Sequence, residues 1–496
     1  MIEITGSIDY RINEITEAKN MKQHFASAAV TSLVLSTLLI LACTGPAAAS
    51  ICTDCHSEIT PEIVQDFQSG AMGNDFDCSR CHGSAHDSAD TVDLVKMPTH
   101  ETCGACHATQ DAQYMDGKHS LAWTAFFVMP TTKDQPKELM EGQKGCGGCH
   151  KIGAKNETGW DEYHYGVVGC DNCHTRHSFS VEEARRPEAC MTCHQGFDHA
   201  QWEMYSTSKH GVIYLTEGDD WDWNAPLSEA KASYTSPTCQ MCHMSDGDHN
   251  VITSWGFLGV RVEEPNEEWT DDRVTVLKSY GVLDADGNTT TRFDLIGPAK
   301  LARLTMDEWN ASREEMIAVC SDCHSEKFAR ISLEEGDQML READRVYAES
   351  VEIVAALHRD GILPEPDYID ELLSYPYPDV LRFYDQSQTI EEDLWVMWMK
   401  YRMRCFQSAF HTNADQEQWY GWGPLKETAV KIKSEDRSLR AEAELAEAVG
   451  AEGMKEKTGT TRTAEGGAGT AESPGFGAAL LVTAFVALFV LLRRRG

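Results

Sequence analysis

Apolar residues in the last third of the chain recur at spacings of three and four, which is the period of an amphipathic helix. Two series with this period cover residues 343–357 and 394–406, and a third helix is expected over about 424–449. Prolines between residues 364 and 378 separate the first two series, because proline interrupts a helix. The pattern predicts a C-terminal three-helix bundle over residues 326–449.

Residues 244–316 have a different pattern of residue types. The segments 251–262 and 274–283 are rich in β-branched residues, and Asp286-Gly287 is a typical turn sequence. This pattern predicts a small β hairpin or sheet inserted into a chain that is otherwise helical.

Residues 1–49 are interpreted as an N-terminal extension followed by an export signal. Residues 1–20 are mixed polar, whereas the stretch after Met21 has a basic residue, an apolar run over 28–42 and small residues at 47–49. This order is typical of a secretory signal peptide. Cys43 lies inside the signal and allows a lipoprotein anchor as the alternative. The mature chain is expected to begin near Ser50 and to be exported.

The C-terminus has three parts. Residues 450–473 are rich in Gly, Thr, Ala and Glu without apolar periodicity, which predicts a flexible linker. Residues 474–496 begin with Pro-Gly-Phe, continue as an apolar run and end in arginines. This tail resembles the sorting signal of archaeal surface proteins, whose apolar segment is replaced by a lipid anchor. A permanent transmembrane anchor is the alternative. Both interpretations tether the protein to the outer face of the cytoplasmic membrane or to the cell surface.

Composition narrows the class of protein. The chain of 496 residues has 79 acidic and 43 basic side chains and a formal net charge of −36. This charge argues against nucleic acid as a partner, because phosphate recognition needs basic residues. The hydrophobic fraction of 42% is enough for a folded core. The unusual numbers are 18 Cys and 19 His, and their spacing decides between disulfides, metal sites and haem.

Sixteen of the cysteines fall into eight Cys-x-x-Cys-His motifs. Two thiols three positions apart can add to the two vinyl groups of one haem, and the next histidine can bind its iron. Disulfides and zinc ribbons do not require a histidine after every second cysteine. The motifs therefore predict eight covalently bound c-type haems, and they leave Cys43 and Cys405 over. The haem-binding cysteines are Cys52, Cys55, Cys78, Cys81, Cys103, Cys106, Cys146, Cys149, Cys170, Cys173, Cys190, Cys193, Cys239, Cys242, Cys320 and Cys323. The motif histidines are His56, His82, His107, His150, His174, His194, His243 and His324.

The motif histidines lie within residues 56–324, which is too short a stretch to build a separate protein core around each haem. The haems are therefore expected to form much of the core. Residues 50–325 are predicted to be a mainly α octahaem cytochrome c domain, with short helices and loops around the haems, followed by the helical bundle.

Free histidines are candidates for the second axial ligand that an electron-transfer haem needs. Ten histidines lie outside the motifs and the signal, and seven of them lie between His86 and His210. His86, His177 and His199 follow a motif histidine too closely to reach the far face of the same haem, so each is expected to serve a neighbouring haem. Seven distal ligands for eight haems leave one iron open. The predicted distal ligands are His86, His100, His119, His164, His177, His199 and His210.

The number and order of the motifs, with the helical C-terminus, make residues 50–449 resemble the octahaem hydroxylamine oxidoreductase family. The likeness extends to shorter segments: Gly117-Lys118-His119, Asp198-His199 through Ser208-Lys209-His210, Cys239 to Met244, and Asp248-His249-Asn250-Val251 with Ser254-Trp255-Gly256-Phe257.

The resemblance implies a homotrimer in which the fourth haem, held by Cys146, Cys149 and His150, is catalytic. It also implies that Asp248 and His249 line the open face of that haem and handle protons there. A turn followed by a distal ligand is the alternative role for Asp248-His249.

Two departures bear on the reaction. Related nitrite reductases carry Lys in place of His at the catalytic motif, whereas all eight motifs here end in His. Hydroxylamine-oxidising members carry a tyrosine that cross-links to the catalytic haem of the neighbouring subunit. The matching stretch, residues 414–421, has Gln416 in that place, and Tyr420 is out of register. The comparison with these families favours the reductive direction.

Two functions remain open. In the first, hydroxylamine, nitrite or nitric oxide binds the open iron of the fourth haem and is converted in the reductive direction, toward ammonia, with electrons exchanged through seven bis-histidine haems. The redox partner would be a cytochrome or a quinone-linked donor or acceptor. In the second, the protein is an extracellular electron-transfer conduit in which all eight haems have two axial ligands.

Overall fold

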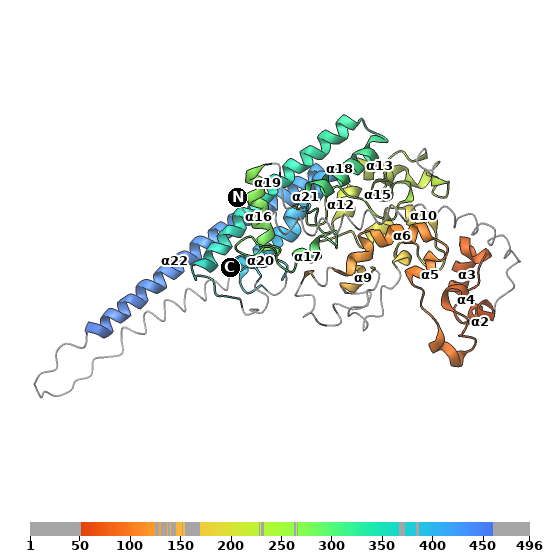
Figure 1. Ribbon diagram of the computed structural model, residues 1–496, viewed down its shortest axis with the longest axis horizontal. Coiled ribbons are helices and arrows are strands. Elements are labelled where there is room, and N and C mark those ends of the chain that lie inside the picture. Colours follow the sequence, from red (N-terminus) through yellow and green to blue (C-terminus); the bar gives the residue numbers. More distant parts are fainter. Residues whose placement is uncertain are drawn as a thin grey trace, which may run out of the picture. The chain divides into compact units, whose positions relative to one another are not determined.

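Short helices joined by loops form the part of the chain that carries most of the motifs (Figure 1). The computed structural model describes residues 51–459 apart from 125–127, 130–135, 137–138, 140–144, 151, 154–168, 228, 230–232, 262–263, 265, 367–372 and 383–385. The α-helices of this part are α2 (Ile51–Ile59), α3 (Pro61–Ser69), α4 (Ser79–His82), α5 (His100–Gly104), α6 (Ala108–Asp116), α9 (Gly147–His150), α10 (Val181–Arg185), α11 (Glu188–Met191), α12 (Gln201–Ser206), α13 (Lys209–Glu217) and α15 (Cys239–His243). Single 3₁₀ turns are η2 (Ala71–Asn74), η3 (Ala89–Leu94), η4 (His119–Thr124), η6 (Cys170–Asn172), η7 (Gly218–Asp220) and η8 (Ser245–Gly247).

Several predictions fall on residues outside this range. The signal peptide with Cys43, the sorting tail and His164 all lie outside the described residues. The chain forms one unit that ends at Leu439 and a second that begins at Arg440, of which the end of α22 is the described part. Within the described ranges, no helix has both the length and the apolar character needed to cross a membrane.

Longer helices begin around the last motif. Ser325 caps the N-terminus of α19, because its side chain accepts a hydrogen bond from the backbone N–H of Phe328 at 3.3 Å. It continues for 34 residues and buries the stripe that the apolar period predicted. These helices are α16 (Glu267–Ser279), α17 (Phe293–Ile296), α18 (Met306–Ser321), α19 (Glu326–Arg359), α20 (Thr389–Val396), α21 (Met403–Phe410) and α22 (Gly423–Gly459).

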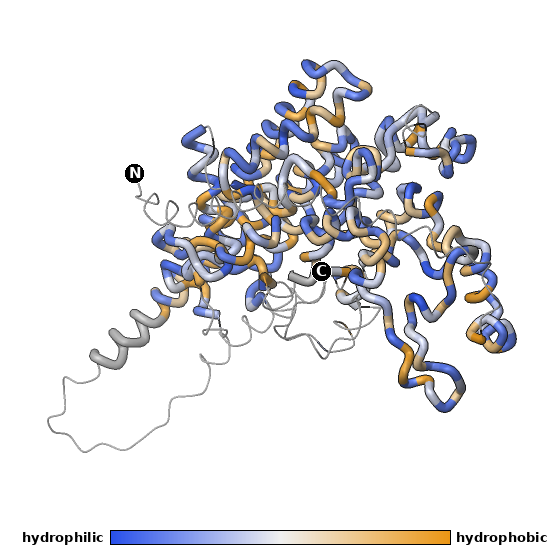
Figure 2. The backbone as a smooth tube through the Cα atoms, turned by 45° about the vertical axis from the view of Figure 1, so that its right-hand side comes forward, coloured by the Kyte–Doolittle hydropathy of each residue, from blue (hydrophilic) through white to orange (hydrophobic). Residues whose placement is uncertain are grey.

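The main hydrophobic cluster is built around α19, against which α16 and α20 pack. Val276 and Leu277 of α16 and Val351 of α19 are among its buried members. Apolar stretches, orange in Figure 2, gather in this region. The longer helices therefore share a hydrophobic core of side chains. The short helices around the motifs do not need such a core if haems fill the space between them.

Two π-helical segments, η10 (Met397–Arg402) and η11 (Gln416–Trp422), flank α21 and contact each other. Cys405, in α21, is fully buried. A Cβ on Gly421 of η11 would lie 2.7 Å from the backbone N of Cys405 in α21, so only glycine allows η11 to approach α21 this closely.

The mainly α prediction is confirmed, whereas the β insertion over 251–283 is wrong. Residues 274–279 belong to α16. Asn266 caps the start of this helix, and its side chain accepts a hydrogen bond from the N–H of Trp269 at 3.1 Å. Burial against α19 outweighs the β propensity of its valines. In the described residues the only β pairing is one bridge between Leu283 and Thr289, around the predicted turn.

Candidate functional site

Each motif forms about one helical turn, which directs its two cysteines and its histidine to one side. The backbone N–H of His150 donates to the carbonyl of Cys146 at 3.0 Å. Residues three and four apart share a helix face, so the two thiols and the imidazole of a motif can contact one flat ligand. All the motif cysteines are free of disulfides. The same backbone bond recurs in the motifs that end at His82, His107, His174, His194 and His324.

Histidine rings from distant parts of the chain face each other in seven pairs, with ring centres 6.0–6.4 Å apart. Two metal–imidazole bonds of about 2 Å each put the bonding nitrogens about 4 Å apart, with the ring centres somewhat farther apart. The spacing therefore leaves room for one metal ion between the rings of each pair. The pairs, each with its motif histidine first, are His56–His86, His82–His177, His150–His199, His174–His249, His194–His119, His243–His411 and His324–His210.

Hydrogen bonds and burial prepare these rings to bind metal. Nδ1 of His82, His243 and His249 donates to a backbone carbonyl at 3.0, 2.8 and 2.8 Å, which leaves Nε2 unprotonated. Burial lowers the pKa of His194 to about 3 and that of His243 to about 4. Both rings are therefore neutral near pH 7, and the neutral imidazole is the form that ligates iron.

One cavity of about 2620 Å³ is lined by cysteines or histidines of all eight motifs. Paired free thiols, neutral imidazoles and facing rings around a continuous cavity fit covalently bound haems.

Cysteines of different motifs also approach one another, and this gives the order in which the haem sites are adjacent. The thiols of neighbouring sites influence one another's pKa in a series that runs from the first motif through the second, third, fifth, sixth and seventh to the eighth. The fourth motif joins this series at the sixth, where Cys149 and Cys193 influence each other's pKa. Among the described residues, the fourth site is thus a side branch, whereas the other seven form a line.

The fourth site has a feature that sets it apart. The ring of His199 faces His150, and a carboxylate oxygen of Asp198 accepts a hydrogen bond from Nδ1 of His199 at 2.8 Å. Burial would raise the pKa of Asp198, but the hydrogen bond and the charge of His199 outweigh it, so the pKa is lowered. The ring of Phe257 stacks on His199 with centres 5.0 Å apart and planes 16° apart. Among the described histidines of the seven pairs whose Nδ1 has a hydrogen-bond partner, only His199 has a carboxylate as that partner.

This arrangement can move protons. A carboxylate on Nδ1 fixes the tautomer of the imidazole and stabilises its charged form. His199 can then take up or release a proton at Nε2.

The predicted catalytic pair Asp248 and His249 has different contacts. His249 faces His174 of the fifth motif at 6.4 Å, and its Nδ1 is 2.8 Å from a backbone carbonyl. Asp248 accepts a hydrogen bond from the backbone N–H of Asn250 at 2.9 Å. These are the contacts of the alternative role, a turn followed by a distal ligand. The Asp-His pair that meets His150 is Asp198 and His199.

Three other histidines complete the account. His411 was not among the predicted distal ligands, yet it faces His243 at 6.2 Å. Its signal in the sequence was weak, since it lies far beyond the last motif, at the end of α21. Nδ1 of His100 donates to a carboxylate oxygen of Asp111 at 2.8 Å. In the described part of the chain, no ring faces His107, the histidine of the third motif.

Comparison with known proteins agrees with this chemistry. A family model described as "Seven times multi-haem cytochrome CxxCH" matches residues 74–280 and 289–367. These residues contain seven of the eight motifs, and the motif that begins at Cys52 precedes them.

Individual relatives come from the same group of proteins. A probable nitrite reductase-hydroxylamine oxidoreductase fusion protein of Kuenenia stuttgartiensis is 27% identical over 484 residues, which cover 78% of this chain and 51% of that protein. The chain thus spans about half the length of this relative. A reducing HAO-like protein complex of the same organism has a chain that is 26% identical with a TM-score of 0.61, over 80% of this chain and 86% of that one. A hypothetical multihaem protein, 20% identical with a TM-score of 0.58 over 79% and 95% of the two chains, shares the fold.

Proposed function

The chain belongs to the multihaem cytochrome family that is defined by repeated CxxCH motifs, and from this premise we propose that it reduces hydroxylamine or nitrite toward ammonia at the fourth motif. Its relatives make it a multihaem oxidoreductase. The observation that carries the finer proposal is the Asp198–His199 pair opposite His150.

The roles of the haem and of the side chains around it follow from their chemistry. A c-type haem, when bound, supplies an iron that can hold a small nitrogen ligand and exchange electrons. Conversion of hydroxylamine to ammonia and water consumes two electrons and two protons. The redox partner supplies the electrons. Nε2 of His199 donates protons on the side opposite His150, and Asp198 compensates the charge of the ring at Nδ1.

The reductive direction is supported by Gln416 and by one relative. Gln416 occupies the position at which hydroxylamine-oxidising members of the resembled family carry the cross-linking tyrosine. Its side chain is buried, and its Oε1 accepts a hydrogen bond from Arg404 at 3.2 Å. An amide cannot make the tyrosine cross-link. One similar solved structure is named a reducing HAO-like protein complex, which agrees with this direction.

The proposal includes the wider setting expected from the sequence. We propose eight covalent haems, export, and a tether to the outer face of the membrane or the cell surface. We also propose a homotrimer that exchanges electrons with a cytochrome or a quinone-linked partner.

A second candidate function rests on the spacing of the fourth pair. The ring centres of His150 and His199 are 6.0 Å apart, which matches the other pairs. If His199 binds the iron, the seven haems with facing histidine pairs all have two axial ligands, as an electron conduit requires. The names of the relatives do not favour this function.

Steady-state turnover tests the proposal. Hydroxylamine and nitrite are assayed with a reduced electron donor, and hydroxylamine with an oxidised acceptor. We expect the donor-driven reaction to be faster and to yield ammonia. His199→Ala should lower its rate by about 10²–10⁴-fold, the usual contribution of a positioned acid–base group. Faster acceptor-driven oxidation would contradict the proposed reductive direction. The absence of turnover in both assays would contradict the proposal that the protein is an enzyme.

A further inference from the structure

Residues 253–259, here called the platform loop, carry the aromatic ring that lies against His199. Phe257 stacks nearly parallel to the His199 ring, with centres 5.0 Å apart. A flat apolar ring in this position restricts rotation of the imidazole about its side-chain bonds. The orientation of His199 therefore depends on where the loop holds Phe257.

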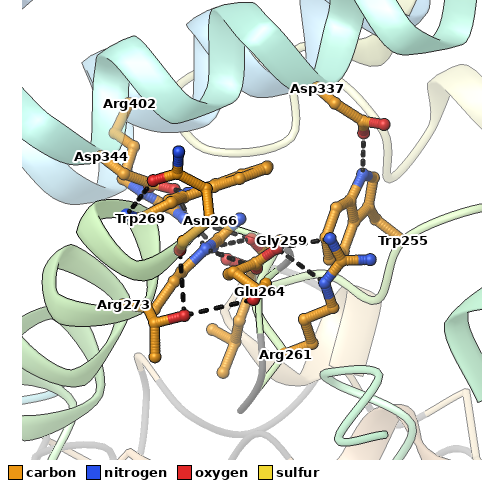
Figure 3. Close-up of polar contacts among 12 residues, drawn as sticks. Trp255, Gly259, Arg261, Glu264, Asn266, Trp269, Arg273, Asp337, Asp344 and Arg402 are labelled. Carbon is orange, nitrogen blue, oxygen red and sulfur yellow. Dashed lines mark hydrogen bonds and ion pairs between the residues drawn. The ribbon is translucent and has the colours of Figure 1, made fainter. Parts of the chain in front are cut away.

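Buried arginines hold the carbonyl groups of this loop (Figure 3). Arg402 donates to the carbonyl of Leu258 at 3.0 Å and to that of Gly259 at 3.3 Å. Arg273 donates to the same carbonyl of Gly259. Both arginine side chains are 0% exposed. Because water does not reach these groups, each bond is directional and has no competitor.

The two arginines are themselves fixed by α19. One oxygen of Asp344 lies 2.7 Å from Nε of Arg402, and the other lies 3.2 Å from Nε of Arg273. Trp269 also donates to Asp344 at 2.8 Å. Burial opposes the charge of Arg402, but Asp344 outweighs it, and the pKa of Arg402 is raised. The guanidinium thus remains charged and keeps its donors.

A second contact joins the loop to α19. Nε1 of Trp255 donates to Asp337 at 3.0 Å, and Asp337 also accepts from Arg313 of α18 at 2.6 Å. The loop ends at Gly259, whose φ of +59° suits glycine. Residues on both sides of Phe257 are therefore tied to the helical core.

Stability alone does not explain this network. Burying ion pairs removes charges from water, and apolar residues of similar volume often stabilise a fold equally well. A buried network can instead fix a position, and here its donors end on the backbone next to Phe257.

We propose that the platform loop, anchored by Arg273 and Arg402, positions Phe257 so that it sets the orientation of the His199 ring opposite His150. Phe257, Arg273 and Arg402 are then positioning residues for the acid–base group. The inference rests on the proposed function for its catalytic consequence, but the positioning itself applies to any role of His199.

The test uses the full haem-loaded protein and two matched pairs of variants. Phe257→Leu removes the flat ring and keeps apolar volume. Phe293→Leu makes the same change at another partly buried ring that packs against the main hydrophobic cluster, as Phe257 does. Arg402→Lys removes the fork of donors and keeps the charge. Arg292→Lys does the same at a buried arginine whose two bonds to Asp379 are 2.7 Å long and which does not touch the loop. Phe257→Tyr keeps the ring and serves as the rescue variant.

Electron paramagnetic resonance of the ferric protein and hydroxylamine turnover are measured for each variant. Phe257→Leu and Arg402→Lys should alter the signal of one haem and lower kcat about tenfold or more, as misplaced groups do. Phe257→Tyr should keep both the signal and the rate. Phe293→Leu and Arg292→Lys should leave the haem signals unchanged even where they lower Tm.

Two results would overturn the positioning role. One is a Phe257→Leu spectrum identical to that of Phe293→Leu, and the other is a spectral change of equal size in both arginine variants. If Arg402→Lys does not fold, the phenylalanine variants still decide. A wild-type protein with only low-spin haems would refute the proposed function but not the positioning role of Phe257. In that case the positioning role predicts a shift of one low-spin signal in Phe257→Leu and no shift in Phe293→Leu.

Discussion

Replacing Asp198 with asparagine removes the negative charge at Nδ1 of His199 while keeping the size of the side chain. The carboxylate accepts a bond of 2.8 Å, and the side chains of Asp198 and His199 are 31% and 21% exposed. Hydrogen bonds to charged groups contribute about 1.5–3 kcal/mol, and partial exposure favours the lower half of that range. Since about 1.4 kcal/mol changes a rate tenfold, kcat should fall about 10- to 50-fold. KM should change little, because the carboxylate lies behind the imidazole.

The sequence offers a matched control in Asp248, which also precedes a histidine. Its carboxylate caps the N–H of Asn250 at 2.9 Å, and its neighbour His249 uses a backbone carbonyl instead. The side-chain oxygen of asparagine can still accept from that N–H, so Asp248→Asn should change kcat by about threefold or less. Donor-driven reduction of hydroxylamine with ammonia detection measures both variants. Equal losses, or a larger loss for Asp248→Asn, would refute the assignment to Asp198 and restore the pair expected from the sequence.

Three further outcomes are expected. Burial, and next the charge of Asp344, raise the pKa of Asp272 to about 6. The native state therefore keeps this proton at pH values where the unfolded chain has lost it, so the free energy of unfolding falls as the pH rises from about 4 to about 6. Asp272→Asn should leave Tm unchanged near pH 4 and, after allowance for its partial exposure, stabilise the fold by about 1 kcal/mol at pH 7, as thermal unfolding at both pH values will show. His411→Ala should convert one low-spin ferric haem to high spin, whereas His358→Ala, which breaks a 3.2 Å contact with Glu391 in the helical core, should not; identical spectra would contradict the His243–His411 pair. Mass spectrometry of the mature protein should find eight added haems and Cys405 unmodified, and a smaller number in fully matured protein would contradict the motif count.

Local chemistry is what the sequence predicts well. A haem attached through two thioethers needs its cysteines and histidine within one helical turn, so the motifs can be read without knowledge of the fold. The buried stripe of α19 is also visible, because a period of 3.6 residues reflects one helix and one core.

Contacts between distant segments are what the sequence leaves undetermined. Asp198-His199 and Asp248-His249 are identical as dipeptides, and they differ only in which group meets Nδ1 and which motif histidine each ring faces. Both depend on tertiary packing. The valines of α16 suggested a strand for a similar reason, since burial against α19 and not local propensity decides their structure.

The spin state of the ferric haems tests the central claim most directly. Iron with two histidine ligands is low-spin, whereas iron that keeps one position open for substrate is high-spin. Electron paramagnetic resonance of the fully oxidised protein, integrated against the haem content, should give a high-spin signal of about one haem in eight. This signal should be perturbed by Asp198→Asn and not by Asp248→Asn. A spectrum in which every haem is low-spin would contradict the open fourth site and identify the protein as an electron conduit.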